Sequence, residues 1–508
     1  MSKFQLLIQQ QMNEIIFHPF LFGALVSLFL FWAITKWFYK PAANKKLPPS
    51  PPKLPILGNL HQLGSLPHRK LQSLAEKHGP LMLLHFGTVP TLVVSSADAA
   101  REIMKTHDLI FADRPQSSVS RRLLYNFKDV SVAPYGEYWR QLKSICVLQL
   151  LSNKRVQSFR SIRDEETALL VNKIRKSSFP VNLSEMFAEL TNDVVCRSAF
   201  GRKFSEGENS KKFLSLLIEL LELLGSFPIG NFIPVLSWIS RVNGFDARVD
   251  KVSKELDEFL EGVIKERMET PNEDKNGANF VDILLDIYQS NSSGVSIDRD
   301  SIKAIILDVF AAGTDTTATV LEWAMTELLR HPSVMKKLQI EVREIVKDKQ
   351  DITDNDLEKM QYLKAVIKET LRFHTPIPLL VPRQARKDVK IMGYDISAGT
   401  MVITNAWAIS RDPVSWDEPE KFEPDRFLNS SIDFKGLDFE LIPFGAGRRG
   451  CPGIAFAMAT TEFVLANIVQ KFNWKLPDEG KELDMKEHPG VTVHRDVPLL
   501  VAATHYHS

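Results

Sequence analysis

The sequence predicts a mainly α-helical protein with small β-sheets, preceded by one N-terminal membrane helix. Three observations predict this class: long stretches with helical periodicity, a few short β-rich runs, and one uncharged apolar segment near the N-terminus. Of the 508 residues, 44% are hydrophobic and 25% are charged, which is typical of a globular chain and excludes disordered and fibrous proteins. No internal repeat or change of composition divides the remainder, which predicts a single large domain.

Charge and cysteine content exclude other classes. The 63 Lys and Arg residues balance 62 Asp and Glu residues, so the chain lacks the basic excess that nucleic-acid binding requires. The three cysteines, Cys146, Cys196 and Cys451, are too few and too scattered for a disulfide framework or a zinc site. We therefore expect most of the chain to lie in a reducing compartment.

The apolar segment Phe20–Thr35 carries no charge, and its flanks extend the expected helix to about residues 16–38. That length approaches the ~20 residues needed to cross ~30 Å of hydrocarbon. Lysines follow the segment at positions 36, 40, 45 and 46, which places the rest of the chain in the cytoplasm. A cleaved signal peptide and a buried core helix are the alternatives, but the basic residues lie on the wrong side for a signal peptide. We expect an anchor over residues 1–40.

The segment that follows, residues 41–59, is rich in proline and predicts a semi-rigid hinge. Residues 60–508 then form the globular domain. Alternation over Leu81–Val94, with Gly87 and Pro90 as turn signals, predicts a β-hairpin. We expect the other elements as follows: mainly helix over 97–269, helix over 298–349 with a break at His331–Pro332, short strands over 387–402, irregular structure over 411–450, and surface loops at 268–279 and 289–296.

The decapeptide Phe444–Gly453, FGAGRRGCPG, is the most informative segment. Its glycines permit backbone conformations closed to other residues, and Pro452 suits the first position of a helix. The Cys451 sulfur would then face unpaired amides at a helix N-terminus, which favour the thiolate. A thiolate in an apolar niche is a good axial ligand for haem iron. A lone C-P-G would favour an ordinary turn with an inert cysteine, but the whole decapeptide favours the metal ligand.

The pattern F-x-x-G-x-R-x-C-x-G, matched by Phe444, Gly447, Arg449, Cys451 and Gly453, resembles the haem-binding signature of the cytochromes P450. Further motifs agree in order and spacing, so the resemblance covers essentially the whole chain. It implies the cytochrome P450 fold, with haem b bound in one large domain and Cys451 as the axial iron ligand.

A second motif, AGTDTT over residues 312–317, lies midway along the helix expected over 300–330. Glycine and consecutive threonines are poor helix formers, and threonine hydroxyls that bond back to carbonyls bend helices, so we expect a local opening. By resemblance this is the oxygen groove: Ala312 contacts the cofactor, Thr316 helps to deliver protons to dioxygen, and Asp315 is its acidic partner. On its own, the motif would more often be a threonine-rich stretch packed in the core.

Two further motifs concern arginines. Glu369 and Arg372 form an i,i+3 pair, which is usually a weak surface salt bridge. The pair resembles the family's buried structural triad, in which Arg426 would be the third member. The sequence Tyr138-Trp139-Arg140 opens an expected helix, and Trp and Arg donors suit anionic haem propionates. The resemblance implies cofactor contacts for the following residues, with Lys143 where the family often has arginine: Arg114, Trp139, Arg140, Lys143, Arg383, Phe444 and Arg449. Each single arginine is more often a solvated surface group.

The segments LPPSPPKLPILGNLHQLG and WRQLKSICVLQLLSNKRVQSF resemble the plant 71 family (A-type, microsomal). The resemblance implies a single-pass protein of the endoplasmic reticulum membrane with its catalytic domain in the cytosol. Its activity would be monooxygenation of a small lipophilic specialised metabolite, a terpenoid or a coumarin or other phenolic. By alignment, the substrate pocket would draw on residues 111–129, 305–316, 376–381 and 490–493.

The chain has no phosphate-binding loop and no convincing dinucleotide fingerprint. Dioxygen would be the co-substrate, and electrons would come from NADPH through a separate NADPH-cytochrome P450 reductase. Four basic residues could form its docking face or instead be buried against the haem or solvated: Arg140, Lys143, Arg448 and Arg449. The alternatives to monooxygenation are a haem-thiolate isomerase or dehydratase that needs no reductase, and a non-catalytic haem-binding scaffold. The Asp315–Thr316 pair argues against both. A membrane-anchored helical protein without haem is a further alternative.

Overall fold

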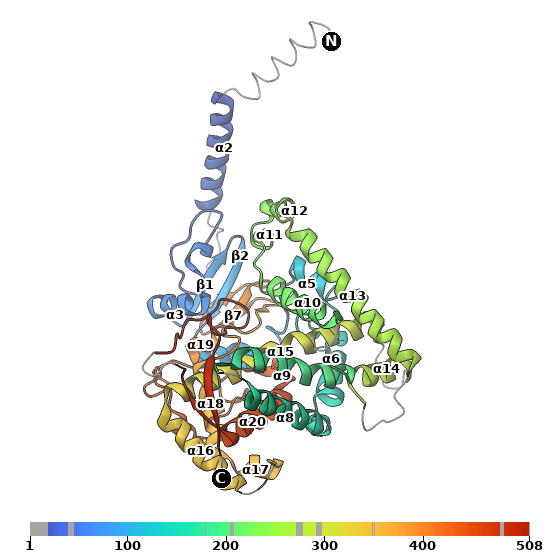
Figure 1. The fold of residues 1–508 in the computed structure, drawn as a ribbon. Coiled ribbons are helices and arrows are strands. Elements are labelled where there is room, and N and C mark those ends of the chain that lie inside the picture. The colour runs from blue at the N-terminus through green and yellow to red at the C-terminus, as the bar shows by residue number, and fades with distance from the viewer. Residues whose placement is uncertain are drawn as a thin grey trace.

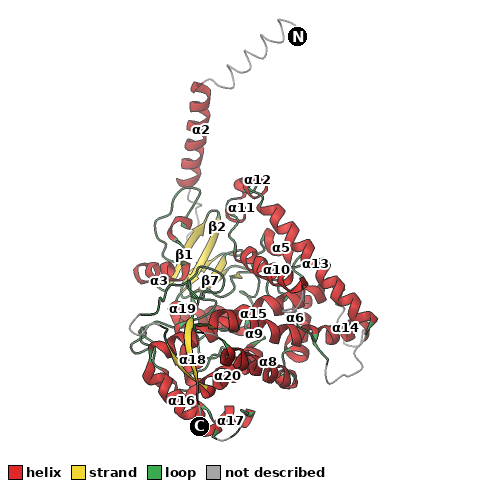
Figure 2. Ribbon diagram, viewed as in Figure 1, coloured by secondary structure: helices red, strands yellow, loops and turns green. Residues whose placement is uncertain are grey.

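The computed structural model describes residues 19–38, 45–177, 179–203, 208–270, 278–290, 297–347, 349, 351–477 and 482–506. Helices make up most of this part of the chain, and short strands gather beside them (Figures 1 and 2). The mainly α fold class with small sheets is therefore confirmed.

The helices have the following bounds: α2 Pro19–Phe38, α3 Pro67–His78, α4 Ala97–Arg101, α5 Ser118–Leu123, α6 Glu137–Ser144, α7 Asn153–Ser158, α8 Arg160–Lys176, α9 Leu183–Phe200, α10 Glu208–Gly225, α11 Ile229–Phe232, α12 Ile239–Val242, α13 Phe245–Glu269, α14 Phe280–Ser290, α15 Arg299–Arg330, α16 Pro332–Val346, α17 Asp354–Lys359, α18 Gln361–Phe373, α19 Ala406–Ile409 and α20 Ile454–Lys471. The strands are β1 Leu81–Phe86, β2 Val89–Val94, β3 Val181–Asn182, β4 Arg383–Gln384, β5 Val389–Ile391, β6 Tyr394–Ile396, β7 Met401–Thr404, β8 Phe472–Lys475 and β9 Leu500–His505.

The main sheet has the strand order β1-β2-β7-β4. β1 and β2 form the predicted antiparallel hairpin, with Leu81 opposite Val94. β7 pairs in parallel with β2 and antiparallel with β4, so the sheet joins the N-terminal third of the chain to residues 383–404. Two smaller sheets, β3-β9-β8 and β5-β6, complete the strand pairing. Arg383, an expected cofactor contact, is the first residue of β4 and so has a backbone fixed by this sheet.

Helix α15 runs through the middle of the domain and packs against α9, α14, α16, α18 and α20 (Figure 1). It begins at its N-cap Asp298, whose side chain accepts a hydrogen bond from the Ser301 amide at 2.9 Å, and it ends before Pro332. Its apolar side chains, among them Ile305, Phe310 and Leu321, are buried on several sides. The expected helix over 300–330 and the break at His331–Pro332 are confirmed. The expected local opening is not, since the helix is continuous through residues 312–317.

The Glu369–Arg372 pair of α18 is fully buried. Arg372 donates two hydrogen bonds to the Glu369 carboxylate, at 2.7 and 2.8 Å, and Arg426 donates a third at 3.2 Å. The remaining Arg372 donors bind the carbonyls of Ser410, Pro419 and Lys421. The triad therefore fixes the irregular segment over residues 410–427 to α18, because each donor that would otherwise be buried unpaired has an acceptor there. This is the geometry that the family resemblance implied.

Most of the remaining chain agrees with the predicted elements. Residues 411–450 contain only short 3-10 turns, as expected. The expected loops at 268–279 and 289–296 lie mostly outside the described residues, as does the part of the anchor before Pro19.

Replacing Glu369 by Ala should strongly destabilise the fold. The change leaves Arg372 buried without its carboxylate, and breaking a buried ion pair from one side costs about 3–5 kcal/mol. Chemical unfolding followed by circular dichroism measures the loss. Lys173→Ala, which breaks an exposed pair with Glu189, serves as the control and should change the unfolding free energy little. Equal stability of the two variants would contradict a structural role for the triad.

Candidate active site

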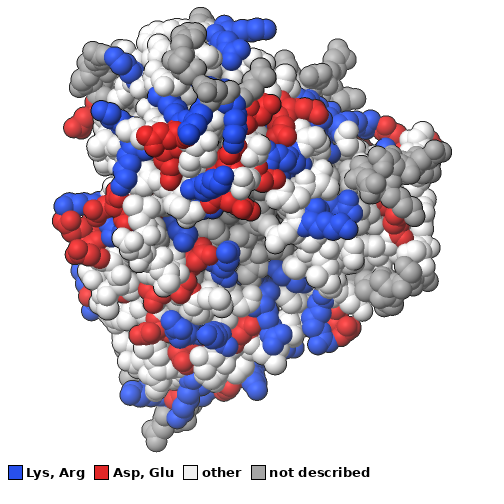
Figure 3. All heavy atoms as spheres, turned by 90° about the horizontal axis from the view of Figure 1, so that it is seen from below, with Lys and Arg blue, Asp and Glu red and all other residues white. Residues whose placement is uncertain are grey.

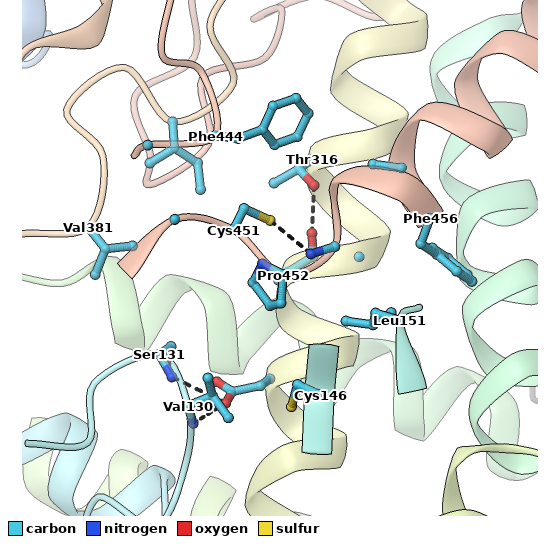
Figure 4. Close-up of a pocket in the computed structure, with 18 of the residues that line it drawn as sticks. Val130, Ser131, Cys146, Leu151, Thr316, Val381, Phe444, Cys451, Pro452 and Phe456 are labelled. Carbon is cyan, nitrogen blue, oxygen red and sulfur yellow. Dashed lines mark hydrogen bonds between the residues drawn. The ribbon is translucent and has the colours of Figure 1, made fainter. Parts of the chain in front are cut away.

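One cavity of about 270 Å³ lies at the centre of the domain, and four parts of the chain supply most of its lining, to which Val195, Phe280 and Leu371 of other helices add. α15 forms one wall, and the Cys451 loop with the start of α20 forms the opposite wall (Figure 4). The segment 376–383 and residues of α6 with the neighbouring Val130 and Ser131 close the remaining sides. The cavity therefore joins segments that are far apart in the sequence.

The backbone of the Cys451 loop is shaped by glycine. Gly447 has a φ of +65°, and a Cβ on this residue would lie 2.2 Å from the Met104 carbonyl oxygen, so only glycine fits. The Cys451 amide donates to the Phe444 carbonyl at 2.9 Å, which closes the loop on itself. Helix α20 begins at Ile454, so the expectation that Pro452 takes the first helical position is wrong. Pro452 lies in the turn just before the helix, where it likewise needs no hydrogen-bond donor.

The Cys451 sulfur points into the cavity and accepts a hydrogen bond from the Gly453 amide at 3.3 Å (Figure 4). The surrounding fold raises the pKa of the Cys451 thiol by desolvation, and the Gly453 amide and the Lys143 ammonium oppose that rise. A cation bound in the cavity, such as a coordinated metal ion, would lower the pKa of the Cys451 thiol and so favour the thiolate. The sulfur has the exposure and the apolar surroundings of a metal ligand.

Across the cavity, α15 presents Ala312, Gly313, Thr316 and Thr317. The Thr316 hydroxyl donates to the Ala312 carbonyl at 2.5 Å, the back-bond expected from the motif. Both Thr316 and Cys451 are drawn at this cavity in Figure 4. Asp315 does not line it; one residue further back on a helix, its side chain is rotated by about 100° from that of Thr316.

Three buried arginines meet at one end of the cavity: Arg114, Arg383 and Arg449. Burial lowers the pKa of Arg114, and the charges of Arg383 and Arg449 lower it further. The pKa of Arg449 falls to about 10, again through burial first and the Arg383 charge second. Arg383 donates to the Asp108 carboxylate at 3.0 Å, so one carboxylate offsets part of the charge. The remaining positive charge creates a strong preference for anions at this end.

These residues fit haem. The sulfur of Cys451 is a soft ligand for iron, the apolar walls suit the porphyrin, and the arginine end suits its two propionates. Phe444 and Ala312, both expected cofactor contacts, also line the cavity. The structure thus brings together Cys451, Thr316, Ala312, Phe444 and the three arginines.

The structure changes the roles expected for three residues of α6. Trp139 lines the cavity, but its indole N–H donates to the Val130 carbonyl at 2.9 Å, and its ring packs under Arg449. The indole N–H is therefore already paired, and only the ring remains available to a group bound in the cavity. Arg140 is exposed and paired with Glu137, because it is rotated by about 100° from the inward face that Trp139 and Lys143 share. The expected cofactor contact of Arg140 is therefore wrong.

Lys143 lies in the cavity, and its ammonium donates to the Gly450 carbonyl at 2.6 Å, one residue before the cysteine. Arg449 is thus buried and Lys143 half-buried with its ammonium turned to the cavity, so neither belongs to an exposed docking face. Arg448 is exposed and pairs with Asp108. Of the four basic residues considered for docking, Arg140 and Arg448 remain at the surface.

Sequence reasoning missed two acids, Asp308 and Asp129. Asp308 of α15 is the one carboxylate among the described residues that line the cavity. Burial, and then the Asp129 charge, raise its pKa to about 8. A signal was present, since an acid at position 308 interrupts an apolar run and lies four and eight residues before Ala312 and Thr316, on the same helical face. The expected pocket segment 490–493 does not line the cavity; Val493 lies behind Pro376, to whose carbonyl its amide donates at 2.8 Å.

Comparison with known proteins agrees with this geometry. The family model "Cytochrome P450" matches residues 48–501 of the chain. The protein "Cytochrome P450 71A8" of Mentha piperita is 66% identical over 98% of each chain. "Psoralen synthase" of Pastinaca sativa is 54% identical over 93% of this chain and 98% of its own. A zebrafish cytochrome P450 structure with abiraterone superposes with a TM-score of 0.74 at 27% identity, covering 87% of this chain and 99% of its own.

The chain therefore belongs to the cytochrome P450 family, and it is a haem b monooxygenase with dioxygen as co-substrate. Within that family it belongs to the plant 71 family, as the resemblance implied. Relatives in that group act on specialised metabolites.

Cys451→Ala should abolish the haem-thiolate spectrum and turnover, because it removes the one thiol that the described Phe444–Gly453 loop presents to the cavity. The reduced-CO spectrum of the purified variant is the measurement. Cys146→Ala is the matched control: its thiol also lines the cavity, but burial raises its pKa to about 12. A thiolate spectrum that survives in the Cys451 variant and is lost in the Cys146 variant would reverse the assignment.

Proposed function

We propose that this protein oxidises a small lipophilic plant specialised metabolite, a terpenoid or a coumarin or other phenolic, at the endoplasmic reticulum membrane. Electrons come from NADPH through NADPH-cytochrome P450 reductase. The observation that carries the proposal is the placement of the Cys451 sulfur and the Thr316 hydroxyl at one largely apolar cavity.

In the proposed mechanism, haem bound in the cavity supplies the activation of dioxygen. Cys451 holds the iron, and Arg114, Arg383 and Arg449 hold the propionates. The apolar lining, which includes Val309, Leu380 and Val381, binds the substrate and excludes water. These roles follow from residues that the structure places around one space.

Thr316 holds and passes protons. Its hydroxyl lines the cavity and donates to the Ala312 carbonyl of its own helix. The hydroxyl oxygen can accept a hydrogen bond from water, and as it receives that proton it would release its own proton into the cavity. Asp315 lies on an adjacent face of α15 and is partly exposed, which suits a carboxylate that takes up protons from outside the cavity. We propose Asp315 as the source and Thr316 as the last donor.

Membrane attachment is supported by two features. α2 contains 20 residues, which at 1.5 Å each span about 30 Å, and its apolar side chains between Leu25 and Trp32 are exposed. At the same end of the molecule, α11 and α12 lie near α2 (Figure 1), and exposed apolar side chains occur there: Phe227, Val235, Trp238 and Val242. We propose an anchor over residues 1–40, a hinge over 41–59 and a cytosolic catalytic domain over 60–508.

Reductase docking is proposed for a surface of mixed charge. Figure 3 shows that the face opposite α2 carries basic and acidic side chains side by side rather than one basic patch. The exposed Arg140 and Arg448 each have an acidic neighbour, so they contribute less to steering than four free basic residues would. Reductase docking on this surface would depend on individual ion pairs between the two proteins, and its affinity should fall as the salt concentration rises.

Product formation tests the proposal. Membranes that contain this protein and a plant reductase are given NADPH and a panel of monoterpenes, sesquiterpenes, coumarins and aldoximes. An NADPH-dependent oxygenated product supports the proposal and names the substrate class. Conversion of hydroperoxides without NADPH, with an intact thiolate spectrum, would instead identify an isomerase or dehydratase.

Thr316→Ala should uncouple the enzyme: NADPH is still consumed, but hydrogen peroxide replaces most of the product. Removing one proton-transfer group typically costs about 10²–10⁴-fold in the step it serves. The ratio of product to NADPH measures coupling. Thr319→Ala is the control, since Thr319 makes the same back-bond, to Asp315 at 2.8 Å, but does not line the cavity. Equal coupling in both variants would exclude the proton role.

Deletion of residues 1–40 should convert an integral membrane protein into a peripherally bound one. The exposed apolar side chains around α11 and α12 still favour the bilayer interface, but without a spanning helix they no longer resist carbonate extraction. Flotation with vesicles, before and after carbonate treatment, distinguishes the two states. Adding Val235→Ser and Val242→Ser to the truncated protein should release it. Truncated protein that still resists carbonate would exclude α2 as the anchor.

A further inference from the structure

The loop over residues 129–133 is held from both sides at the edge of the cavity. Its amides face carboxylates on α15 and within the loop itself, whereas its carbonyls face the arginines at the other end. Backbone in a loop of this kind has no strand or helix partner, so side chains decide where it lies.

The carboxylate side is built around Asp308. Its Oδ2 accepts the Val130 amide at 2.6 Å and the Ser131 amide at 3.3 Å, and the dashed lines from these two residues in Figure 4 end there. Asp129 turns back on its own loop: its Oδ2 accepts the Ser131 hydroxyl at 2.5 Å and the Val132 amide at 2.8 Å. Of the two acids, Asp308 alone belongs to another element, the rigid helix α15.

The guanidinium side consists of the arginines that face the cavity. Arg114 donates to the Ser131 carbonyl at 3.0 Å, and Arg449 donates to the carbonyls of Val130 at 3.3 Å and Ala133 at 2.6 Å. Two loop residues, Val130 and Ser131, therefore connect Asp308 of α15 to two of the three buried arginines. If the loop moves, the acceptors that orient both guanidiniums move with it.

We propose that Asp308 is a positioning residue for the haem site: it fixes the 129–133 loop to α15, and the loop in turn orients Arg114 and Arg449 toward the propionates. The inference rests on the proposed role of these arginines. Asp308 acts as a hydrogen-bond acceptor rather than as a charge. A protonated carboxylic acid keeps an acceptor oxygen, so the two amides retain their partner even though burial beside Asp129 favours the neutral form.

Release of haem from the purified holoprotein to an excess of a haem-scavenging apoglobin tests the proposal, with the Soret band as the readout. Asp308→Ala leaves two buried amides without an acceptor and should release haem about tenfold faster than the parent protein. Asp308→Asn keeps an acceptor oxygen and should stay within about threefold of the parent rate.

Two control variants separate positioning from general destabilisation. Asp356→Ala removes another buried carboxylate, which caps α17 through Thr353 away from the cavity, and should leave the release rate unchanged. Arg449→Leu tests the proposed arginine role directly and should accelerate release. If Arg449→Leu accelerates release and Asp308→Ala does not, the inference about Asp308 fails alone. If neither accelerates release, the arginine role fails as well.

A further pair of variants tests the mechanism where Asp308→Ala does not yield folded holoprotein. Asp308→Glu keeps the charge but displaces the acceptor by one methylene, whereas Asp308→Asn keeps the acceptor and loses the charge. Positioning by an acceptor requires faster release from the Glu variant than from the Asn variant. The opposite order, with Asn faster than Glu, would show that the charge matters and would overturn the proposal.

Discussion

Burial of positive charge at one end of a single cavity is the constraint on which the rest of the structure depends. Three guanidiniums, of Arg114, Arg383 and Arg449, lie inside the domain, where an unpaired charge costs several kcal/mol. The protein offsets this cost partly with Asp108 and mostly with backbone carbonyls of segments that have no regular structure. The arginines thus hold irregular chain in place, and their positive charge favours anionic groups at this end of the cavity. On the proposed role of these arginines, folding around the cavity and binding of the cofactor depend on the same groups, and bound haem adds to stability by mass action.

Helix α15 forms one wall of this cavity, and each of its faces carries residues suited to its neighbour. Toward α9 it needs a small residue, and Gly313 supplies it: a Cβ there would lie 3.2 Å from the Val195 side chain. Toward the cavity it carries positions 308, 312 and 316, spaced by four residues, so acid, alanine and threonine lie along one line. The close packing of α9 gives that line a rigid support. A helix placed this firmly can hold a hydroxyl opposite the sulfur of a separate loop.

Sequence reasoning recovered the parts of the site that depend on local pattern. The Cys451 loop followed from its own residues, the α15 motif and the Glu369 triad followed from the family resemblance, and the hairpin and the long helix follow from periodicity. Side-chain direction was harder to predict. Arg140 and Lys143 both lie within one turn of α6, and only the packing of that helix decides that the lysine faces the cavity and the arginine faces solvent. Asp129 and Asp308 were missed because their pairing joins positions 179 residues apart, and an isolated acid in the sequence carries no information about such a partner.

The separation of roles along α15 has a consequence for the evolution of substrate choice. Thr316 and Asp308 are eight residues apart, or about 12 Å along the helix, and the segment between them lines the cavity. Val130 and Ser131 form part of the cavity wall at the Asp308 end, while their backbone also contacts Arg114 and Arg449. A substitution that reshapes this wall therefore also displaces acceptors of the arginines, and it alters cofactor affinity together with substrate fit. The segment 376–381 is different. Its residues Ile377, Leu380 and Val381 present apolar side chains to the cavity. Of its backbone carbonyls, only that of Val381 accepts a hydrogen bond from one of the three arginines, from Arg114 at 2.5 Å. Because a side-chain change at Ile377 or Leu380 leaves that carbonyl in place, selectivity can vary in this segment at lower cost than in the 129–133 loop.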